Sequence, residues 1–311
     1  MKHSDGNPIK TENTTHRRQK KGLVFDIINI TVFGLFTLLC VFPFYYLFIN
    51  TISDNNLVTK GAITFYPIGI NISNYIALKE VNDLVNSFIV TLTRTIFGTA
   101  LMVMASAFAG YLVTKKNLWM RKFWYRFIVI TMYFNAGLIP WYMNMLMLGL
   151  TNTYLAYIIP GIVAPFNIIL VKTYIESIPA ELEESAFIDG ASNFTIFRKI
   201  IWPLSKPILA TIAIFGAVGN WNSFQDSLIL MKGAPQLFTL QHRLYVYLVK
   251  ASDLEAVMAG GAGMTNVLEN SLNSKVVKYT IAMATIMPIL LVYPFMQRYF
   301  VKGIMLGAVK G

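Results

Sequence analysis

The segment ESIPAELEESAFIDGASNFTIFRKIIWPLSK, residues 176–206, separates two apolar stretches of membrane-spanning length. Pro179 suits the first turn of a helix, because the N–H that it lacks would be unpaired there. The glutamates that follow place negative charge at the positive end of the helix dipole. A short helix is therefore predicted from Pro179 to about Ile188.

A second short helix is predicted directly after the first. Gly190 can adopt the left-handed conformation that closes a helix, and Ser192 or Asn193 can cap the next one. Pro203 is expected to stop this second helix about three turns later. The two helices would form an elbow with a small side chain at Ser185. Large apolar side chains are expected to project from the elbow into a groove of another protein: Phe187, Ile188, Phe194, Ile196 and Phe197.

Two motifs in the elbow carry a resemblance to a known family. Residues 184–190 fit the pattern E-[SA]-A-x-x-x-G, and residues 200–203 fit I-x-[LW]-P. This resembles the EAA loop of permease subunits of ATP-binding-cassette (ABC) importers, in which the loop forms coupling helices seated on the ATPase. Where the family usually has Ala and Leu, this chain has Ser185 and Trp202. The resemblance implies six residues that couple to an ATPase: Glu184, Ser185, Ala186, Asp189, Gly190 and Pro203.

Further motifs resemble the sugar-importing branch of that family. NWNSF at 220–224 and YPFMQRYFVKG at 293–303 are similar to the maltose-permease type of inner-membrane subunit. NAGLIP at 135–140 and LGLTNTY at 148–154 look most like permeases for oligosaccharides or polysaccharide fragments. The resemblance covers the chain from about residue 23 onward. It implies a type I importer fold, a second permease subunit, a cytoplasmic ATPase dimer and an extracellular solute-binding protein.

Composition predicts an all-α polytopic membrane protein. The chain is 55% hydrophobic and 13% charged, and its mean hydropathy of +0.55 is too high for a water-soluble fold of this length. Six apolar runs approach the roughly 20 residues that cross a bilayer. We expect a cytoplasmic disordered tail over 1–21 and a permease domain over 22–311. The six predicted transmembrane helices are 24–49, 88–113, 127–147, 154–171, 208–231 and 279–296.

Basic residues predict the orientation of these helices. Lys and Arg gather in the N-terminal tail, in 115–126, in the elbow segment and after residue 297, and short cytoplasmic loops carry such an excess. Both termini and the elbow are therefore predicted to be cytoplasmic, in a bacterial inner or plasma membrane. The formal net charge of +11 is explained by topology and by anionic lipid headgroups, so no nucleic-acid partner is predicted.

The sequence predicts that this chain is not itself an enzyme. It lacks the G-x-x-x-x-G-K-[ST] phosphate loop, so we expect ATP and Mg on a separate ATPase and no cofactor on this chain. No catalytic group or metal cluster has suitable spacing, and His242 is expected to stand alone outside the membrane. The alternative is a secondary carrier subunit driven by an ion gradient. Such a carrier would be expected to show internal repeats and acidic residues within spans, and neither is evident.

Polar residues in the fifth predicted span allow two interpretations. Amides, an indole and a carboxylate suit a sugar path, because rings stack on a pyranose and amides bond its hydroxyls. Polar residues within spans also join subunits through hydrogen bonds between helices. The residues concerned are Asn220, Trp221, Asn222, Gln225 and Asp226.

Arg94 lies within the second predicted span and needs a partner, since an unpaired charge there is costly. The sequence leaves three candidates: Asp226, a backbone carbonyl or a partner subunit.

Overall fold

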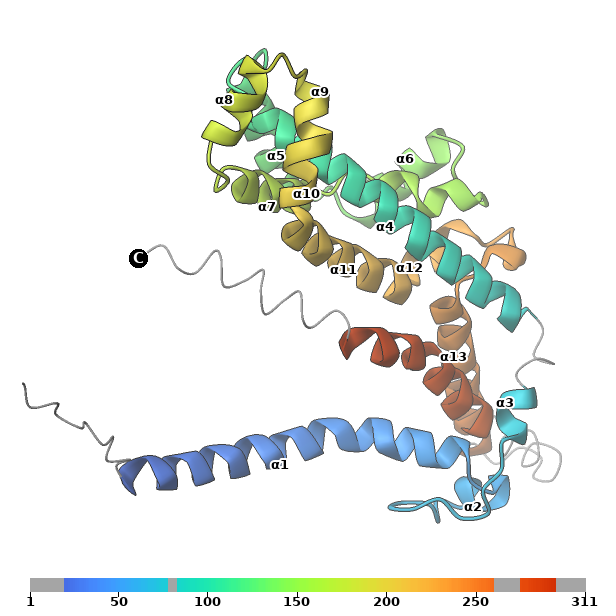
Figure 1. Ribbon diagram of the computed structural model, residues 1–311. Helices are drawn as coiled ribbons and strands as arrows, with labels where there is room; N and C mark the ends of the chain where they lie inside the picture. Colours follow the sequence, from blue (N-terminus) through green and yellow to red (C-terminus); the bar gives the residue numbers. More distant parts are fainter. Residues whose placement is uncertain (1–19, 78–82, 260–274, 295–311) are drawn as a thin grey trace, which may run out of the picture. The chain divides into compact units, whose positions relative to one another are not determined.

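The computed structural model describes residues 20–77, 83–259 and 275–294, which are mostly helical and contain no strand (Figure 1). The chain divides into two units, Met1–Leu47 and Phe48–Gly311. All but two residues of the predicted tail 1–21 lie outside the described residues, and Lys20 and Lys21 begin the first helix.

Helix α1, Lys20–Thr51, supplies the described part of the first unit. Its segment Phe25–Thr51 has a mean hydropathy of 2.2, so it is long and apolar enough to cross a membrane. Pro43 lies inside the helix.

The second unit is built around α4, Leu84–Thr114, which packs along α11, Lys206–Asn222, and α7, Pro165–Ile175 (Figure 1). Gly110 permits the close approach of α4 and α7. A Cβ atom added there would lie 3.0 Å from a Val171 methyl carbon and 3.1 Å from the Lys172 backbone nitrogen. The absence of a side chain at Gly110 therefore sets how closely these helices pack.

Shorter elements surround this centre. The α-helices are α2 Asn55–Thr59, α3 Ser73–Ala77, α5 Arg121–Tyr133, α6 Leu138–Met147, α8 Glu181–Ile188, α9 Asn193–Ile196, α10 Trp202–Leu204, α12 Gln225–Leu230 and α13 Leu240–Ala259. The turns of other types are η1 Tyr154–Tyr157, η2 Ile159–Gly161, the π turn η3 Phe197–Ile201 and η4 Pro235–Leu237. A last described helix, Lys275–Pro294, is drawn in red in Figure 1.

Three described helices are long and apolar enough to cross a membrane: Phe25–Thr51, Leu84–Thr114 and Lys275–Pro294. Two bent pairs raise that number to five if each pair is one span. Tyr154–Gly161 with Pro165–Ile175 bends by 42°, and Asn193–Leu204 with Lys206–Asn222 bends by 78°.

The third predicted span, 127–147, is not one helix. Helix α5 ends at Tyr133 and α6 begins at Leu138. Gly137 between them has φ +89°, outside the helical region, and its N–H donates 2.8 Å to the Asn135 side chain. These local preferences break the helix in spite of its apolar sequence.

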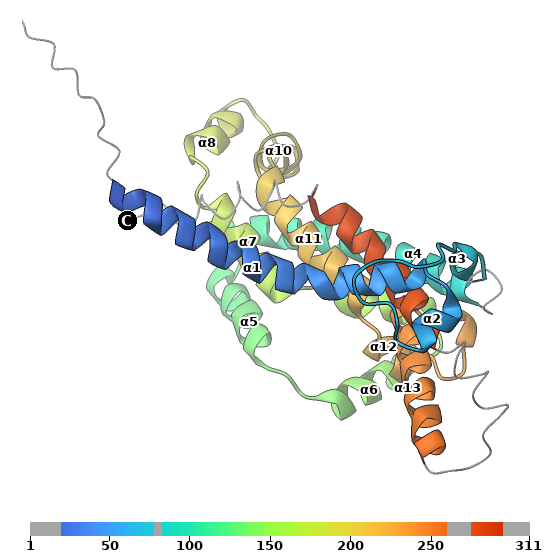
Figure 2. The same cartoon turned by 90° about the horizontal axis from the view of Figure 1, so that it is seen from below.

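The two ends of α4 carry different structures. The elbow elements α8 to α10 lie at its C-terminal end, whereas α12 and α13 lie towards its N-terminal end (Figure 1). The view from below shows α8 beside α10, away from α13 (Figure 2).

Candidate functional site: a helical elbow and a buried polar cluster

The elbow has the local structure that its sequence predicts. Helix α8 ends at Ile188, and Gly190 follows with φ +78°, the left-handed conformation that favours glycine. Of the two candidate caps, Ser192 caps α9, because its hydroxyl oxygen accepts from the Thr195 N–H at 3.3 Å. The predicted turn and the capped second helix are confirmed. The first helix begins at Glu181, so Pro179 lies before it and not in its first turn.

The second arm of the elbow contains a π turn that the sequence did not indicate. Helix α9 continues through η3 into α10 and ends at Leu204, one residue after Pro203. Pro203 has no N–H to donate to the helical ladder, and the widened turn ends two residues before it, at Ile201.

The elbow is attached to α4 through two residues at the end of that helix. The ammonium of Lys115 forms an ion pair with Glu183 of α8 and lies 4.0 Å from the centre of the Tyr111 ring. The Tyr111 hydroxyl donates 3.1 Å to the Asn193 carbonyl at the start of α9. Both arms of the elbow are thus fixed to one span-length helix.

The structure divides the predicted apolar surface in two. Ile188 is 87% exposed, Phe194 62% and Phe187 47%. Ile196 and Phe197, by contrast, are buried in the core with Tyr111, and the prediction that they project outward is wrong. They hold the second arm against the membrane helices instead.

The predicted coupling residues are mostly accessible. Ala186 is partly buried and packs against the core, which fixes the orientation of α8. The others are exposed: Glu184, Ser185, Asp189, Gly190 and Pro203.

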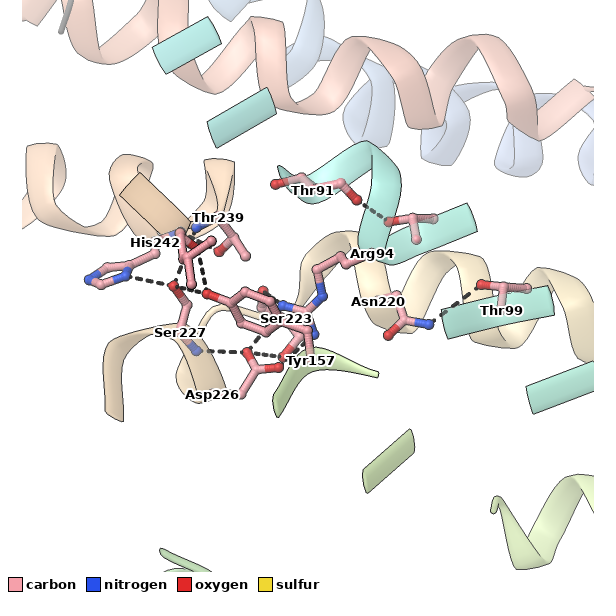
Figure 3. Close-up of polar contacts among 12 residues, drawn as sticks. Thr91, Arg94, Thr99, Tyr157, Asn220, Ser223, Asp226, Ser227, Thr239 and His242 are labelled. Atoms are coloured by element: carbon pink, nitrogen blue, oxygen red, sulfur yellow. Dashed lines mark hydrogen bonds and ion pairs between the residues drawn. The ribbon is translucent and has the colours of Figure 1, made fainter. Parts of the chain in front are cut away.

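At the other end of α4, Arg94 is 2% exposed and bonds Asp226 (Figure 3). Its Nη2 lies 2.5 Å from Asp226 Oδ2, and its Nη1 donates 3.3 Å to Oδ1 and 3.4 Å to the Ser223 carbonyl. Asp226 also accepts hydrogen bonds of 2.9 Å from the Ser223 hydroxyl and from the Ser227 N–H. Two of the three partners considered for Arg94, the carboxylate and a backbone carbonyl, are therefore present.

Tyr157 extends the cluster from Arg94 to η4 and α12. Its ring centre lies 4.4 Å from the Arg94 guanidinium carbon. Its hydroxyl donates 2.6 Å to the Leu237 carbonyl and lies 2.9 Å from the Ser227 hydroxyl (Figure 3).

His242 completes the cluster, and the prediction that it stands alone is wrong. It is 3% exposed, and its Nδ1 lies 2.9 Å from the Ser227 hydroxyl. Burial lowers the pKa of His242 to about 4; the charge of Arg243 also lowers this pKa, while that of Asp226 raises it. The imidazole is therefore neutral at pH 7, which avoids a second buried cation near Arg94.

The polar run of the fifth predicted span lies at a break in the helix. Helix α11 ends at Asn222, and α12 begins at Gln225; both residues are exposed. The Asn220 amide donates to the Thr99 hydroxyl at 3.4 Å, across to α4. The break therefore exposes the amide side chains of Asn222 and Gln225.

Trp221 does not belong to that exposed surface. It is 6% exposed, its indole N–H donates 3.0 Å to the Thr285 carbonyl, and its ring meets Phe88 edge-on. These contacts give Trp221 a packing role, and its place in a sugar path stays a prediction.

Sequence reasoning missed Tyr157, Ser227 and the role of His242. The one available signal was that a buried arginine needs several partners. Nothing in the sequence showed that Tyr157, 63 positions after Arg94, or the still more distant Ser227 and His242 would join this cluster.

Comparison with known proteins is consistent with this geometry. Residues 102–306 match the family described as "Binding-protein-dependent transport system inner membrane component". The chain is 33% identical over 297 residues to Protein LplC of Bacillus subtilis (strain 168), covering 96% of this chain and 98% of that protein. It is 32% identical over 291 residues to the polygalacturonan/rhamnogalacturonan transport system permease protein YtcP of the same organism, covering 94% and 100%.

A solved structure shares the fold. The crystal structure of a bacterial ABC transporter involved in the import of the acidic polysaccharide alginate contains a chain that matches with a TM-score of 0.79 and 31% identity. The match covers 90% of this chain and 98% of that one. The chain described here therefore belongs to the family of binding-protein-dependent transport system inner membrane components, the permease subunits of ABC importers.

Proposed function

We propose that this permease forms half of the translocation path for an oligosaccharide or a polysaccharide fragment. The observation that carries the coupling part of this proposal is the elbow: it exposes Ile188 and Phe194 while Lys115 and Tyr111 fix it to α4. The sugar is inferred from relatives, since YtcP is named for polygalacturonan and rhamnogalacturonan, and the matching solved transporter imports alginate.

The elbow would be the site where a cytoplasmic ATPase dimer docks. Exposed apolar side chains of this size suit a groove on another protein. The ATPase would hold ATP and Mg, and its closure would move the elbow and, through α4, the membrane helices. The residues proposed to make or orient this contact are Glu184, Ser185, Ala186, Asp189, Gly190 and Pro203.

The proposed topology has six spans with both termini in the cytoplasm of a bacterial cell. Such an arrangement counts α5 with α6 as one interrupted span, in addition to the five candidates described above. It places the elbow beside the ATPase and α13 on the outer side, where a solute-binding protein would deliver the sugar. A second permease subunit would complete the path.

Five residues are proposed to contribute to that path: Asn220, Trp221, Asn222, Gln225 and Asp226. Asn222 and Gln225 are exposed at the helix break, and Asp226 is held in place by Arg94. If Asn222 contacts the sugar, Asn222→Ala should impair uptake and leave the assembled complex intact. Loss of the complex instead would assign Asn222 to the interface between the permeases.

Uptake into proteoliposomes tests the proposal. The complete complex would be reconstituted with its solute-binding protein and offered labelled oligogalacturonate, oligomannuronate or arabino-oligosaccharide. We expect uptake of at least one of them that requires ATP and is abolished by replacing the phosphate-loop lysine of the ATPase. Uptake driven by an imposed ion gradient without ATP would contradict the proposal and favour a secondary carrier.

A further inference from the structure

A polar and aromatic surface lies where the broken fifth span meets α13. It consists of Asn222, Phe224 and Gln225 from the break, with Gln241 and Tyr245 from α13. We propose that these five residues form a sugar subsite that binds a ring through its apolar face and its hydroxyl groups. The inference rests on the proposed sugar-import function and names the residues that would contact the sugar.

Two stacked rings form the apolar part of the subsite. The ring centres of Phe224 and Tyr245 lie 5.1 Å apart, with 24° between the ring planes. Tyr245 nevertheless keeps 38% of its surface exposed. Since each ring orients the other, the exposed part of Tyr245 is pre-organised for a ligand, which lowers the entropic cost of binding.

Amide groups form the polar part of the subsite. Gln241 lies one helical turn before Tyr245, so both share a face of α13. The Gln241 amide donates 3.2 Å to Asn222 Oδ1, and the Asn222 amide donates 3.0 Å to the Val218 carbonyl. This chain of hydrogen bonds orients both amides, and each keeps hydrogen-bonding capacity for a ligand hydroxyl.

The position of the subsite suits a transport path. Arg243 of α13 forms a hydrogen bond with Asp83, the residue directly before α4. The Leu240 N–H donates a hydrogen bond of 2.8 Å to the hydroxyl of Thr91, which lies in the first turns of α4. The subsite therefore lies towards the end of α4 that is remote from the elbow. Broken helices supply binding sites in transporters because their ends expose backbone and side-chain polar groups inside a cavity.

The charges near the subsite indicate what it recognises. None of its five residues carries a formal charge. Two arginines of the described residues lie close to it. Arg94 is buried and paired with Asp226. Arg243, two residues from both Gln241 and Tyr245, is paired with Asp83. The subsite thus offers amides and rings to hydroxyl groups and to the C–H face of a pyranose, and no free cation to a sugar carboxylate. It would hold a ring without requiring that ring to be a uronate.

Substitutions at Tyr245 test the subsite in the reconstituted complex. The probe is whichever of the three labelled oligosaccharides named above the unmodified complex imports. Tyr245→Leu should raise the KM for uptake by about 3- to 10-fold, the size expected for loss of one aromatic contact. Tyr245→Phe and Tyr245→Trp should keep KM within about 2-fold, because a ring remains.

A matched control separates this effect from a general loss of an exposed tyrosine. Tyr133, at the end of α5, is 80% exposed. Tyr133→Leu should leave KM unchanged, and recovery of the complex should be normal for all four variants.

The outcomes that overturn the inference are distinct. If Tyr245→Leu leaves KM unchanged while the unmodified complex imports the sugar, the subsite is wrong and the proposed function stands. If Tyr245→Leu lowers recovery of the complex at unchanged KM, the surface is an interface with the second permease. If the unmodified complex imports none of the three sugars, the proposed function fails, and the subsite fails with it.

Discussion

The Arg94 guanidinium and the Asp226 carboxylate lie 2.5 Å apart, although 132 positions separate them in the sequence. The pair joins α4 to α12 immediately after the break in the fifth span. Because Arg94 is buried, its positive charge is stabilised by protein groups in place of water. These groups are the Asp226 carboxylate, the Ser223 carbonyl and the face of the Tyr157 ring.

Removal of either charge should strongly destabilise the permease. Breaking a buried pair by removing one partner costs about 3–5 kcal/mol, since the other charge is left uncompensated. Arg94→Ala and Asp226→Asn should each lower the midpoint of thermal unfolding of the purified complex. The double variant should lose much less than the sum of the single losses. Additive losses would show that the two side chains do not depend on each other.

Trp221 should contribute to the stability of the complex. Its buried ring and its hydrogen bond to Thr285 predict that Trp221→Ala costs about 3–5 kcal/mol. Thermal unfolding of the complex measures this loss, and Trp221→Phe should lose less because most of the packing remains. A stable Trp221→Ala complex with impaired sugar uptake would contradict the packing role.

Two helical glycines should respond in opposite ways to alanine. At Gly110 a new Cβ would press on Val171 and on the backbone of Lys172, so Gly110→Ala should destabilise by about 1–3 kcal/mol. At Gly219 nothing lies within 4 Å of the new atom, and Gly219→Ala should be neutral or stabilise by up to about 1 kcal/mol. The comparison uses the same unfolding measurement. Equal effects would mean that α4 and α7 do not pack as described.

His242 should make stability depend on pH. Its folded-state pKa is lowered to about 4 from an ordinary value of 6.5, so the unfolded chain binds a proton in this range and the folded chain does not. The His242 contribution to the free energy of unfolding should therefore be complete above pH 6.5 and decrease as pH falls towards 4. In His242→Gln the midpoint of thermal unfolding should depend less on pH over that range. An unchanged pH profile in this variant would show that His242 is not buried in its neutral form.

Much of this architecture can be predicted from sequence where the signal is local. The turn of the elbow was predicted from Gly190 and the start of its second helix from the cap at Ser192, because each residue acts on the backbone beside it. The spans at Leu84–Thr114 and Lys275–Pro294 follow from apolar length. Pairing of Arg94 was predicted because a charge in a span needs a partner within reach.

Other features depend on contacts that sequence does not reveal. Phe194 and Phe197 are equally apolar, yet Phe194 is exposed and Phe197 packs beside Tyr111, because only one side of the second arm faces α4. The contacts of Trp221 with Phe88 and with the Thr285 carbonyl were likewise not predicted, because both partners lie on other helices. The direction in which such a side chain points depends on which helices, distant in the sequence, pack together.

Docking of the elbow on an ATPase is the central claim, and co-purification with quantitative mass spectrometry tests it most directly. The tagged permease would be purified in mild detergent from its own membranes, alongside Ile188→Glu and Gly190→Pro. The matched controls are Ile70→Glu and Gly149→Pro. Ile70 is 75% exposed in the loop before α3. Gly149 has φ +65°, and nothing lies within 4 Å of a Cβ atom added there.

The unmodified chain, Ile70→Glu and Gly149→Pro should recover a phosphate-loop ATPase and a second permease. Ile188→Glu should lose the ATPase because a charge enters the proposed apolar contact, and Gly190→Pro should lose it because proline cannot adopt the required φ. Both elbow variants should retain the second permease. Full recovery of the ATPase with both elbow variants would contradict the proposal that the elbow is its docking site.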